Sequence, residues 1–171
     1  LVARAAETDL LTALRAEIVS QFGAHPMDSY DFPRVASPEH FERLTGMIAG
    51  ENVFCGGGWS RDTLKIEPTV VSRPKPDSLL MREPVFGPVL PVLSYGSIQE
   101  AVQLMRQLPA PRALYCFSDD EGAARRLMRD MRFGSGRIND CGTRAASPQV
   151  PSGGVGESGM GACCGRAGFE C

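Results

Sequence analysis

A chain of 171 residues with 43% hydrophobic and 22% charged residues has an ordinary globular composition and the length of about one domain. Its formal net charge of −2 gives no electrostatic reason to bind nucleic acid or an anionic membrane surface, so no nucleic-acid contact is expected. No apolar run approaches the roughly 20 residues of a membrane span, so none is expected.

Residues 1–50 predict two amphipathic helices joined by a loop. Apolar residues recur at helical spacing over residues 10–22, and Gly23 is expected to end this helix. Ser37 is expected to cap a second helix, which has Pro38 at its first position and ends at Gly50. The buried stripe of that second helix is predicted to consist of Phe41, Leu44 and Ile48.

Residues 51–140 alternate between extended and helical patterns. Strands are predicted at residues 52–55, 65–71, 89–95, 112–117 and 135–140. The apolar run at 89–95 is typical of a strand covered on both faces. Capping boxes at Ser97-x-x-Glu100 and Ser118-x-x-Glu121 predict the two helices between the last three strands. This order predicts an α/β fold with a parallel sheet and right-handed crossovers.

The last part of the chain, residues 141–171, is rich in glycine. Its stretch 147–165 has too many glycines to predict a regular element, and it lacks both known phosphate-loop patterns. We therefore predict a helical lead-in at 1–50, an α/β core at 51–140 and a glycine-rich C-terminal segment at 141–171.

Cysteine usage favours a reducing, intracellular compartment, mitochondrial or cytoplasmic. The six cysteines show neither a CxxC pair nor zinc spacing, so no metal site is predicted. Cys116 is expected to act as a small hydrophobe, whereas Cys163 and Cys164 leave a redox role open. The opening LVARAAETDLL has no signal-peptide pattern and no Met, so a fragment, a processed product or an incomplete chain is expected.

Six blocks of the sequence, in order, carry a family resemblance. They are GGGWSRDTLKIEPTVV (56–71), MREPVFGPVLPVLSY (81–95), ALYCFSDD (113–120), SGRIND (135–140), PSGGVGESGMG (151–161) and GRAGFE (165–170). Together they resemble the aldehyde dehydrogenase family, and its class 3-like branch most closely. The resemblance covers nearly the whole chain and implies the C-terminal, parallel-sheet part of the catalytic domain, without the dinucleotide-binding domain.

The resemblance also implies a chemistry. In the family, a cysteine thiolate attacks the aldehyde, hydride passes to NAD(P), and a Glu-activated water releases the acid. The nucleophile, the general base and the oxyanion-hole Asn all lie upstream of the region that this chain matches. The resemblance therefore implies no catalytic residue here and no cofactor for this chain alone, with NAD(P) expected for a complete enzyme.

The segment before residue 89 departs from the family at one position. The family has Glu-Glu-Ile/Val-Phe-Gly-Pro there, and the second Glu holds the nicotinamide ribose hydroxyls. Pro84 occupies that position and cannot accept those hydrogen bonds. Glu83 and Phe86 are the remaining candidates for cofactor contacts, as vestiges of that site. In the family the residue matching Phe86 packs near the nicotinamide; the alternative is a core aromatic beside Gly87.

A second departure lies near the C-terminus. The family commonly has Pro-Phe-Gly-Gly, with the aromatic lining the substrate funnel, and here Ser152 replaces it. Ser152 and Gly153 are thus the candidate substrate-pocket residues. Asn139 matches the family's Asn after the last strand and is expected to anchor the loop that follows.

Three hypotheses of function follow. The first is a non-catalytic aldehyde dehydrogenase-like protein, a pseudoenzyme that binds other protein subunits in a larger complex or homo-oligomer as a structural or accessory subunit. The second is an incomplete fragment of an active NAD(P)-dependent enzyme that oxidises aldehydes to carboxylic acids. The third is a small thiol-based redox protein that uses Cys163 and Cys164.

Overall fold

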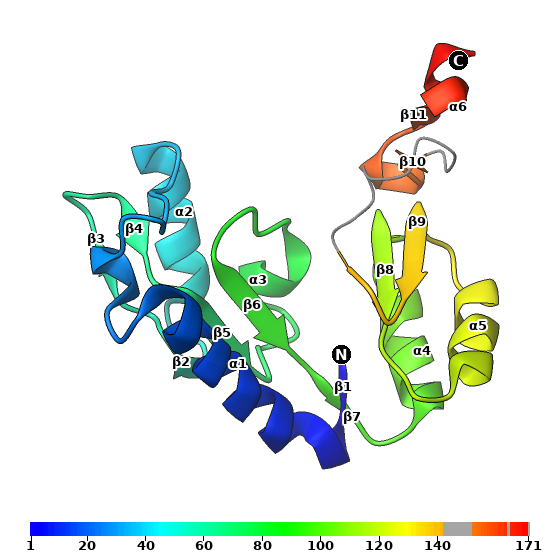
Figure 1. Cartoon of the computed structure of the whole chain (residues 1–171), viewed down its shortest axis with the longest axis horizontal. Helices are drawn as coiled ribbons and strands as arrows, with labels where there is room; N and C mark the ends of the chain where they lie inside the picture. The colour runs from blue at the N-terminus through cyan, green and yellow to red at the C-terminus, as the bar shows by residue number, and fades with distance from the viewer. Residues whose placement is uncertain (142–151, 164, 171) are drawn as a thin grey trace. The chain divides into compact units, whose positions relative to one another are not determined.

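The computed structural model describes residues 1–141, 152–163 and 165–170. The chain divides into two compact units, Leu1–Ala101 and Val102–Cys171, and each is described by itself. Figure 1 shows the helices and strands of both. Helices and parallel strand pairs occur in each unit, which confirms the predicted α/β class.

The helices of the first unit follow the sequence patterns closely. Helix α1 spans Glu7–Phe22, and Gly23 ends it with a left-handed φ of +80°. Helix α2 spans Pro38–Ile48, and the Ser37 hydroxyl accepts a hydrogen bond from the His40 backbone N–H at 3.2 Å. Single helical turns occur at η1 (Arg4–Ala6), η2 (Pro26–Asp28) and α3 (Leu79–Arg82).

Three strands form the main sheet of this unit. Strands β2 (Val53–Cys55), β5 (Thr69–Ser72) and β6 (Val89–Val92) lie in the order β2-β5-β6. The β2–β5 pair is antiparallel, and the β5–β6 pair is parallel. Two smaller pairs are the antiparallel β3 (Trp59–Ser60) with β4 (Lys65–Ile66), and the parallel β1 (Val2–Ala3) with β7 (Ser94–Tyr95).

Two of the predicted strands are each divided into two shorter ones. The segment 65–71 is divided into β4 and β5 at Glu67-Pro68, because Pro68 has no N–H for a ladder bond. The run 89–95 is divided at Leu93. Its prediction as a strand covered on both faces is wrong for this unit, since Leu90 is 47% exposed.

The central strand β5 connects two hydrophobic clusters. All of its residues are buried, and successive side chains of a strand point to opposite faces. Val71 packs with Phe41 and Leu44 of α2, whereas Val70 packs with Leu11 of α1. The two long helices thus cover opposite faces of the sheet, and α2 is fixed by its buried stripe, as predicted.

The second unit contains a parallel pair, β8 (Ala113–Cys116) with β9 (Ser135–Ile138), and helix α5 (Glu121–Arg129) between them in sequence. Helix α4 spans Ile98–Arg106, and its predicted cap is present because the Glu100 N–H donates to the Ser97 hydroxyl. The second predicted capping box is wrong. Asp120 caps α5 by accepting from the Ala123 N–H at 2.8 Å, so the helix begins later than Ser118 suggested.

The glycine-rich segment does contain short regular elements. Strand β10 (Ser152–Gly153) pairs antiparallel with β11 (Ala162–Cys163), and η4 (Gly156–Ser158) lies between them. Helix α6 spans Gly165–Phe169. The prediction of no regular element at 147–165 is therefore wrong for the described part, whereas 147–151 and Cys164 lie outside it.

Candidate functional site

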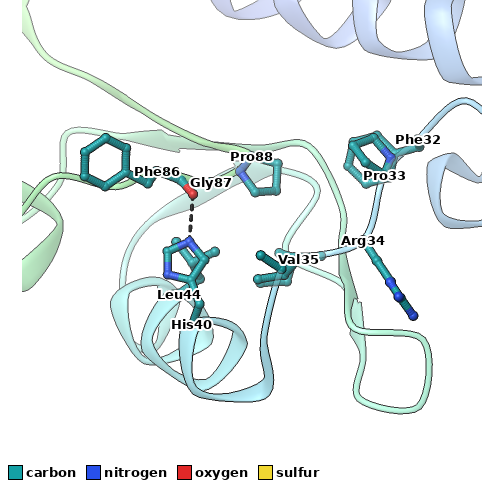
Figure 2. Close-up of a pocket in the computed structure, with 11 residues that line it drawn as sticks. Phe32, Pro33, Arg34, Val35, His40, Leu44, Phe86, Gly87 and Pro88 are labelled. Atoms are coloured by element: carbon teal, nitrogen blue, oxygen red, sulfur yellow. Dashed lines mark hydrogen bonds between the residues drawn. The ribbon is translucent and has the colours of Figure 1, made fainter.

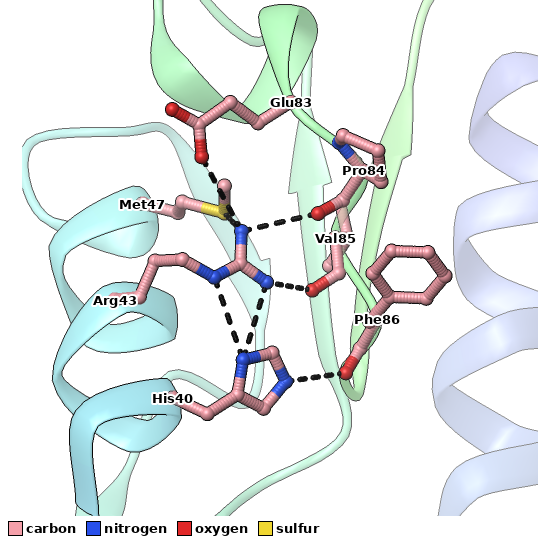
Figure 3. A network of polar contacts seen from close by, with 7 residues as sticks. All are labelled: His40, Arg43, Met47, Glu83, Pro84, Val85 and Phe86. Atoms are coloured by element: carbon pink, nitrogen blue, oxygen red, sulfur yellow. Dashed lines mark hydrogen bonds and ion pairs between the residues drawn. The ribbon is translucent and has the colours of Figure 1, made fainter. Parts of the chain in front are cut away.

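One face of helix α2 points at the loop 83–88, which precedes β6 (Figure 3). His40, Arg43 and Met47 follow one another at spacings of three and four residues, so they lie on the same side of the helix. His40 and Arg43 form polar contacts with the loop, and Met47 accepts a hydrogen bond from Arg43. The network joins segments that are about forty residues apart in sequence.

Arg43 binds two successive backbone carbonyls of this loop. Its Nη1 donates to the Pro84 oxygen at 3.0 Å, and its Nη2 donates to the Val85 oxygen at 2.6 Å. Nη1 also lies 3.5 Å from Oε2 of Glu83 and 3.5 Å from the Met47 sulfur. A guanidinium presents donors in a rigid fork, which suits two neighbouring carbonyls.

His40 binds the next carbonyl. Its Nε2 lies 2.8 Å from the Phe86 oxygen, and its Nδ1 lies 3.4 Å from both Nε and Nη2 of Arg43. Because a guanidinium only donates, Nδ1 is the acceptor and Nε2 carries the hydrogen that goes to Phe86. Three successive carbonyls, at 84, 85 and 86, thus receive hydrogen bonds from two side chains of α2.

Phe86 stands out from this loop into solvent. Its side chain is 82% exposed, and its backbone has a φ of +46°, in the left-handed region. A non-glycine residue there carries a conformational cost of about 1–3 kcal/mol, so surrounding contacts must hold it. Figure 3 shows the ring pointing away from α2. Within this chain Phe86 is therefore not part of the hydrophobic core.

Glu83 points in the opposite sense, toward the guanidinium of Arg43 (Figure 3). Its backbone is extended, with φ −114° and ψ 149°, as the proline that follows requires. The carboxylate nearest to Pro84 is thus engaged with α2. The two candidate cofactor residues are close in sequence but their side chains diverge.

A pocket of about 320 Å³ lies beside the loop (Figure 2). It is lined by Phe32, Pro33, Arg34, Val35, Ala36, His40, Leu44, Ile66, Phe86, Gly87 and Pro88. Most of this lining is apolar. Phe86 and His40, which are joined by the contact to the Phe86 carbonyl, both belong to this lining.

The candidate substrate residues lie in the other unit. Ser152 and Gly153 form strand β10, opposite Cys163 and Ala162 of β11. The Gly153 backbone oxygen lies so close to Gly134 that a β-carbon at Gly134 would collide with it. Their role in a substrate pocket stays a prediction.

Asn139 anchors a loop of its unit, whereas residues 142–151 of the loop that it was expected to anchor lie outside the described residues. Its Oδ1 accepts from the Ser118 N–H at 2.9 Å, and its Nδ2 donates to the Ser118 oxygen at 3.0 Å. It therefore anchors the loop after β8, the preceding parallel strand. Asn139 adopts a φ of +54°, which asparagine tolerates better than most residues.

Residues 1–141, 152–163 and 165–170 contain neither a cluster of metal-ligating side chains nor a membrane-spanning helix. Within these ranges no group of three or more His, Cys, Asp or Glu side chains could hold a metal ion. No helix there is both long enough and apolar enough to span a bilayer. The side chains of Cys163 and Cys164 lie outside the described residues, so the redox hypothesis gains no structural support.

Comparison with known proteins gives the family. The aldehyde dehydrogenase family matches residues 1–171. This chain belongs to the aldehyde dehydrogenase family. It is 40% identical to the 4,4′-diaponeurosporen-aldehyde dehydrogenase of Staphylococcus aureus, over 99% of this chain and 38% of that protein. It is 35% identical to aldehyde dehydrogenase family 3 member F1 of Arabidopsis thaliana, over 95% of this chain and 34% of that protein.

A solved structure shares the fold of this aldehyde dehydrogenase chain. The substrate-bound state of Staphylococcus aureus AldH matches with a TM-score of 0.94 and 39% identity, over 99% of this chain and 38% of that one. The class 3-like resemblance is confirmed. The aldehyde dehydrogenase chain spans little more than a third of the length of these relatives.

The sequence reasoning missed His40 and Arg43 as parts of this site. The signal available was their helical spacing, since His40 lies three residues before Arg43 and Arg43 lies four residues before Met47. Nothing in that pattern indicated which loop they would meet, because the partner carbonyls belong to a distant segment.

Proposed function

We propose that this chain forms the nicotinamide-facing part of an NAD(P)-dependent aldehyde dehydrogenase that oxidises aldehydes to carboxylic acids. In this proposal Phe86 packs against the nicotinamide ring. Pro84 leaves the ribose hydroxyls without the carboxylate that the family resemblance implies. The single observation that carries the proposal is Phe86, held outward at a left-handed φ.

The exposed, left-handed conformation of Phe86 has two free-energy costs. Leaving a phenylalanine in water forgoes about 1.5–3 kcal/mol of burial free energy. The left-handed backbone adds a further cost of about 1–3 kcal/mol. Without a ligand, neither the exposed ring nor the left-handed backbone of Phe86 stabilises the chain. A ring that contacts a flat ligand is buried by it, so the burial free energy is recovered. Backbone strain of this kind gathers at ligand sites, which supports a binding role.

The chain's own groups have distinct tasks in this proposal. NAD(P), when bound, accepts the hydride from the substrate carbon. The Phe86 ring supplies an apolar surface that limits the orientations of the nicotinamide. Pro84 offers the ribose no side-chain acceptor, and the Glu83 carboxylate contacts Arg43. Since each hydrogen bond to a charged group is worth about 1.5–3 kcal/mol, cofactor binding is expected to be weaker than with a carboxylate at this position.

The test uses the complete protein that contains this chain. NADH or NADPH formation is followed at 340 nm with aliphatic and aromatic aldehydes, for the natural protein and for Phe86→Ala and Pro84→Glu. We expect turnover, a loss of at least about tenfold in kcat/KM for Phe86→Ala, and a lower cofactor KM for Pro84→Glu. Turnover that is indifferent to Phe86→Ala would overturn the role of this residue.

A second candidate is a non-catalytic structural or accessory subunit. The observation that favours it is the Arg43–Glu83 contact of 3.5 Å, which directs the carboxylate beside Pro84 toward α2. This candidate predicts neither aldehyde oxidation nor NAD(P) binding by calorimetry, for the natural protein and for Pro84→Glu alike. It also predicts a stable complex with other protein subunits or with further copies. Aldehyde-dependent NAD(P)H formation would exclude it.

A further inference from the structure

We propose that His40 and Arg43 are positioning residues for Phe86, acting through the backbone of the loop 84–86. Their hydrogen bonds set where the aromatic ring stands. The effect of these residues on catalysis rests on the proposed function. Their effect on the position of the loop can be tested without any cofactor.

The loop depends on these two side chains for its hydrogen bonds. Within the described part of the chain, no backbone N–H donates to the carbonyl oxygens of Pro84, Val85 or Phe86. Two residues after Phe86, the carbonyl of Pro88 accepts from the Thr69 N–H at 2.8 Å, next to the start of the β5–β6 pairing. The segment between helix α3 and the sheet is therefore held at its carbonyls by α2.

The two side chains act as one unit. Arg43 donates to His40 Nδ1, which leaves Nε2 as the donor to the Phe86 oxygen at 2.8 Å. Arg43 thereby fixes the tautomer that His40 needs, in addition to its own bonds to Pro84 and Val85. Removing Arg43 is expected to weaken all three carbonyl contacts.

Helix α2 does not need this pair for its own packing. Its place in the core is set by Phe41, Leu44, Met47 and Ile48, which are all buried. His40 and Arg43 lie at the edge of that stripe and are half-buried. Replacing them is thus expected to release the loop while the helix and the sheet stay in place.

The first experiment measures the loop alone, by chymotrypsin digestion of the complete folded protein followed by mass spectrometry. Cleavage after Phe86 is compared with cleavage after Phe117, which is 66% exposed and serves as the reference within each sample. The variants are His40→Leu, His40→Gln and Arg43→Lys. Glutamine keeps an N–H donor at the position of Nε2, and lysine keeps the charge but loses the fork.

We expect cleavage after Phe86, relative to Phe117, to rise roughly tenfold in His40→Leu and in Arg43→Lys, and His40→Gln to restore most of the protection. The matched controls are His25→Gln and Arg61→Lys. Arg61 pairs with Glu42 of α2 at 3.0 Å, and in the described part of the chain neither control side chain forms a hydrogen bond or ion pair with the loop 84–86. Equal cleavage ratios in all variants, including no cleavage in any, would overturn the proposal.

The second experiment measures the consequence for the reaction. In the complete protein, His40→Leu and Arg43→Lys are expected to raise the KM for NAD(P) and lower kcat, with the KM for aldehyde changed less and His40→Gln close to the natural values. Thermal unfolding midpoints identify any variant that fails to fold. An inactive natural protein would overturn the proposed function and leave the digestion result to decide the positioning role.

Discussion

Leu44 of α2 occupies the space that a side chain at position 87 would need. An ideal β-carbon on Gly87 would lie 2.5 Å from Leu44 Cδ1 and 2.7 Å from Cδ2. Leu44 is fully buried in the main cluster, so it cannot turn aside without disturbing its neighbours. We therefore expect Gly87→Ala to lower the free energy of unfolding by about 1–3 kcal/mol, measured by urea denaturation.

A matched glycine on the same helix gives the control. Gly46 lies within α2, is exposed, and has nothing within 4 Å of an added β-carbon. Gly46→Ala is expected to stabilise the protein by about 0.5–1 kcal/mol, since alanine is the better helix former. If Gly87→Ala proved neutral or stabilising, Leu44 would not be the constraint on the loop described above.

The pair Glu7–Arg73 predicts an acid dependence of stability. Glu7 is buried, and Arg73 donates to its two carboxylate oxygens at 3.0 and 2.6 Å. These hydrogen bonds, and secondarily the charge of Arg73, lower the pKa of Glu7 despite the opposing effect of burial. A carboxyl whose pKa is lowered by folding stabilises the protein above its unfolded pKa of about 4.3 and loses that contribution as pH falls through the folded value.

We therefore expect the free energy of unfolding to fall below about pH 4.3 more steeply in the natural protein than in Glu7→Gln. Urea denaturation between pH 3 and pH 7 measures this difference. Glu17→Gln, an exposed carboxylate on the same helix, is the control. Parallel pH profiles for the natural protein and Glu7→Gln would contradict the role of the pair.

The cap of α2 predicts a moderate and specific loss. Ser37 accepts from the His40 N–H, which satisfies one of the free donors at the helix start. Ser37→Ala is expected to cost about 1 kcal/mol of stability, and Ser37→Asp to retain most of it, because aspartate is an equally good cap. Thermal or urea unfolding checks both variants; equal losses in the two would show that the hydroxyl contact is not what stabilises the helix.

Thiol reactivity separates two of the described cysteines. Burial raises the pKa of the Cys116 thiol, which lies in strand β8, whereas Cys141 is exposed. Iodoacetamide is expected to label Cys141 first, and the labelling of Cys116 to need a more alkaline pH. Peptide mass spectrometry at several pH values measures both rates. Faster labelling of Cys116 than of Cys141 would contradict the burial effect.

Local signals predicted helix starts and ends well where one signal stood alone. Ser37-Pro38 was the single start predicted for the second helix, and α2 begins there. Before α5, Ser118 and Asp120 both fit a cap, and the geometry after β8 selected Asp120 while Asn139 bound Ser118. Choices of that kind depend on a neighbouring strand, which a local pattern does not contain.

Only those residues of the candidate site that lie in a family motif were predicted from the sequence. Phe86, Glu83 and Pro84 came from the family resemblance, and the exposure of Phe86 is consistent with a ligand contact. The partners His40 and Arg43 could not be predicted, because their bonds join positions 46, 41 and 42 residues apart in sequence. A single sequence carries the helical face but not the identity of the loop that it meets.

The hydrogen bonds from α2 go to backbone carbonyls, and this has a consequence for which substitutions the loop tolerates. Every amino acid carries a carbonyl, proline included, so positions 84, 85 and 86 can change their side chains without losing the bonds to Arg43 and His40. Position 84 can therefore hold different side chains while its carbonyl keeps the bond to Arg43. A library randomised at position 84 is therefore expected to stay folded, and under the proposed function its members are expected to differ in their affinity for NAD(P).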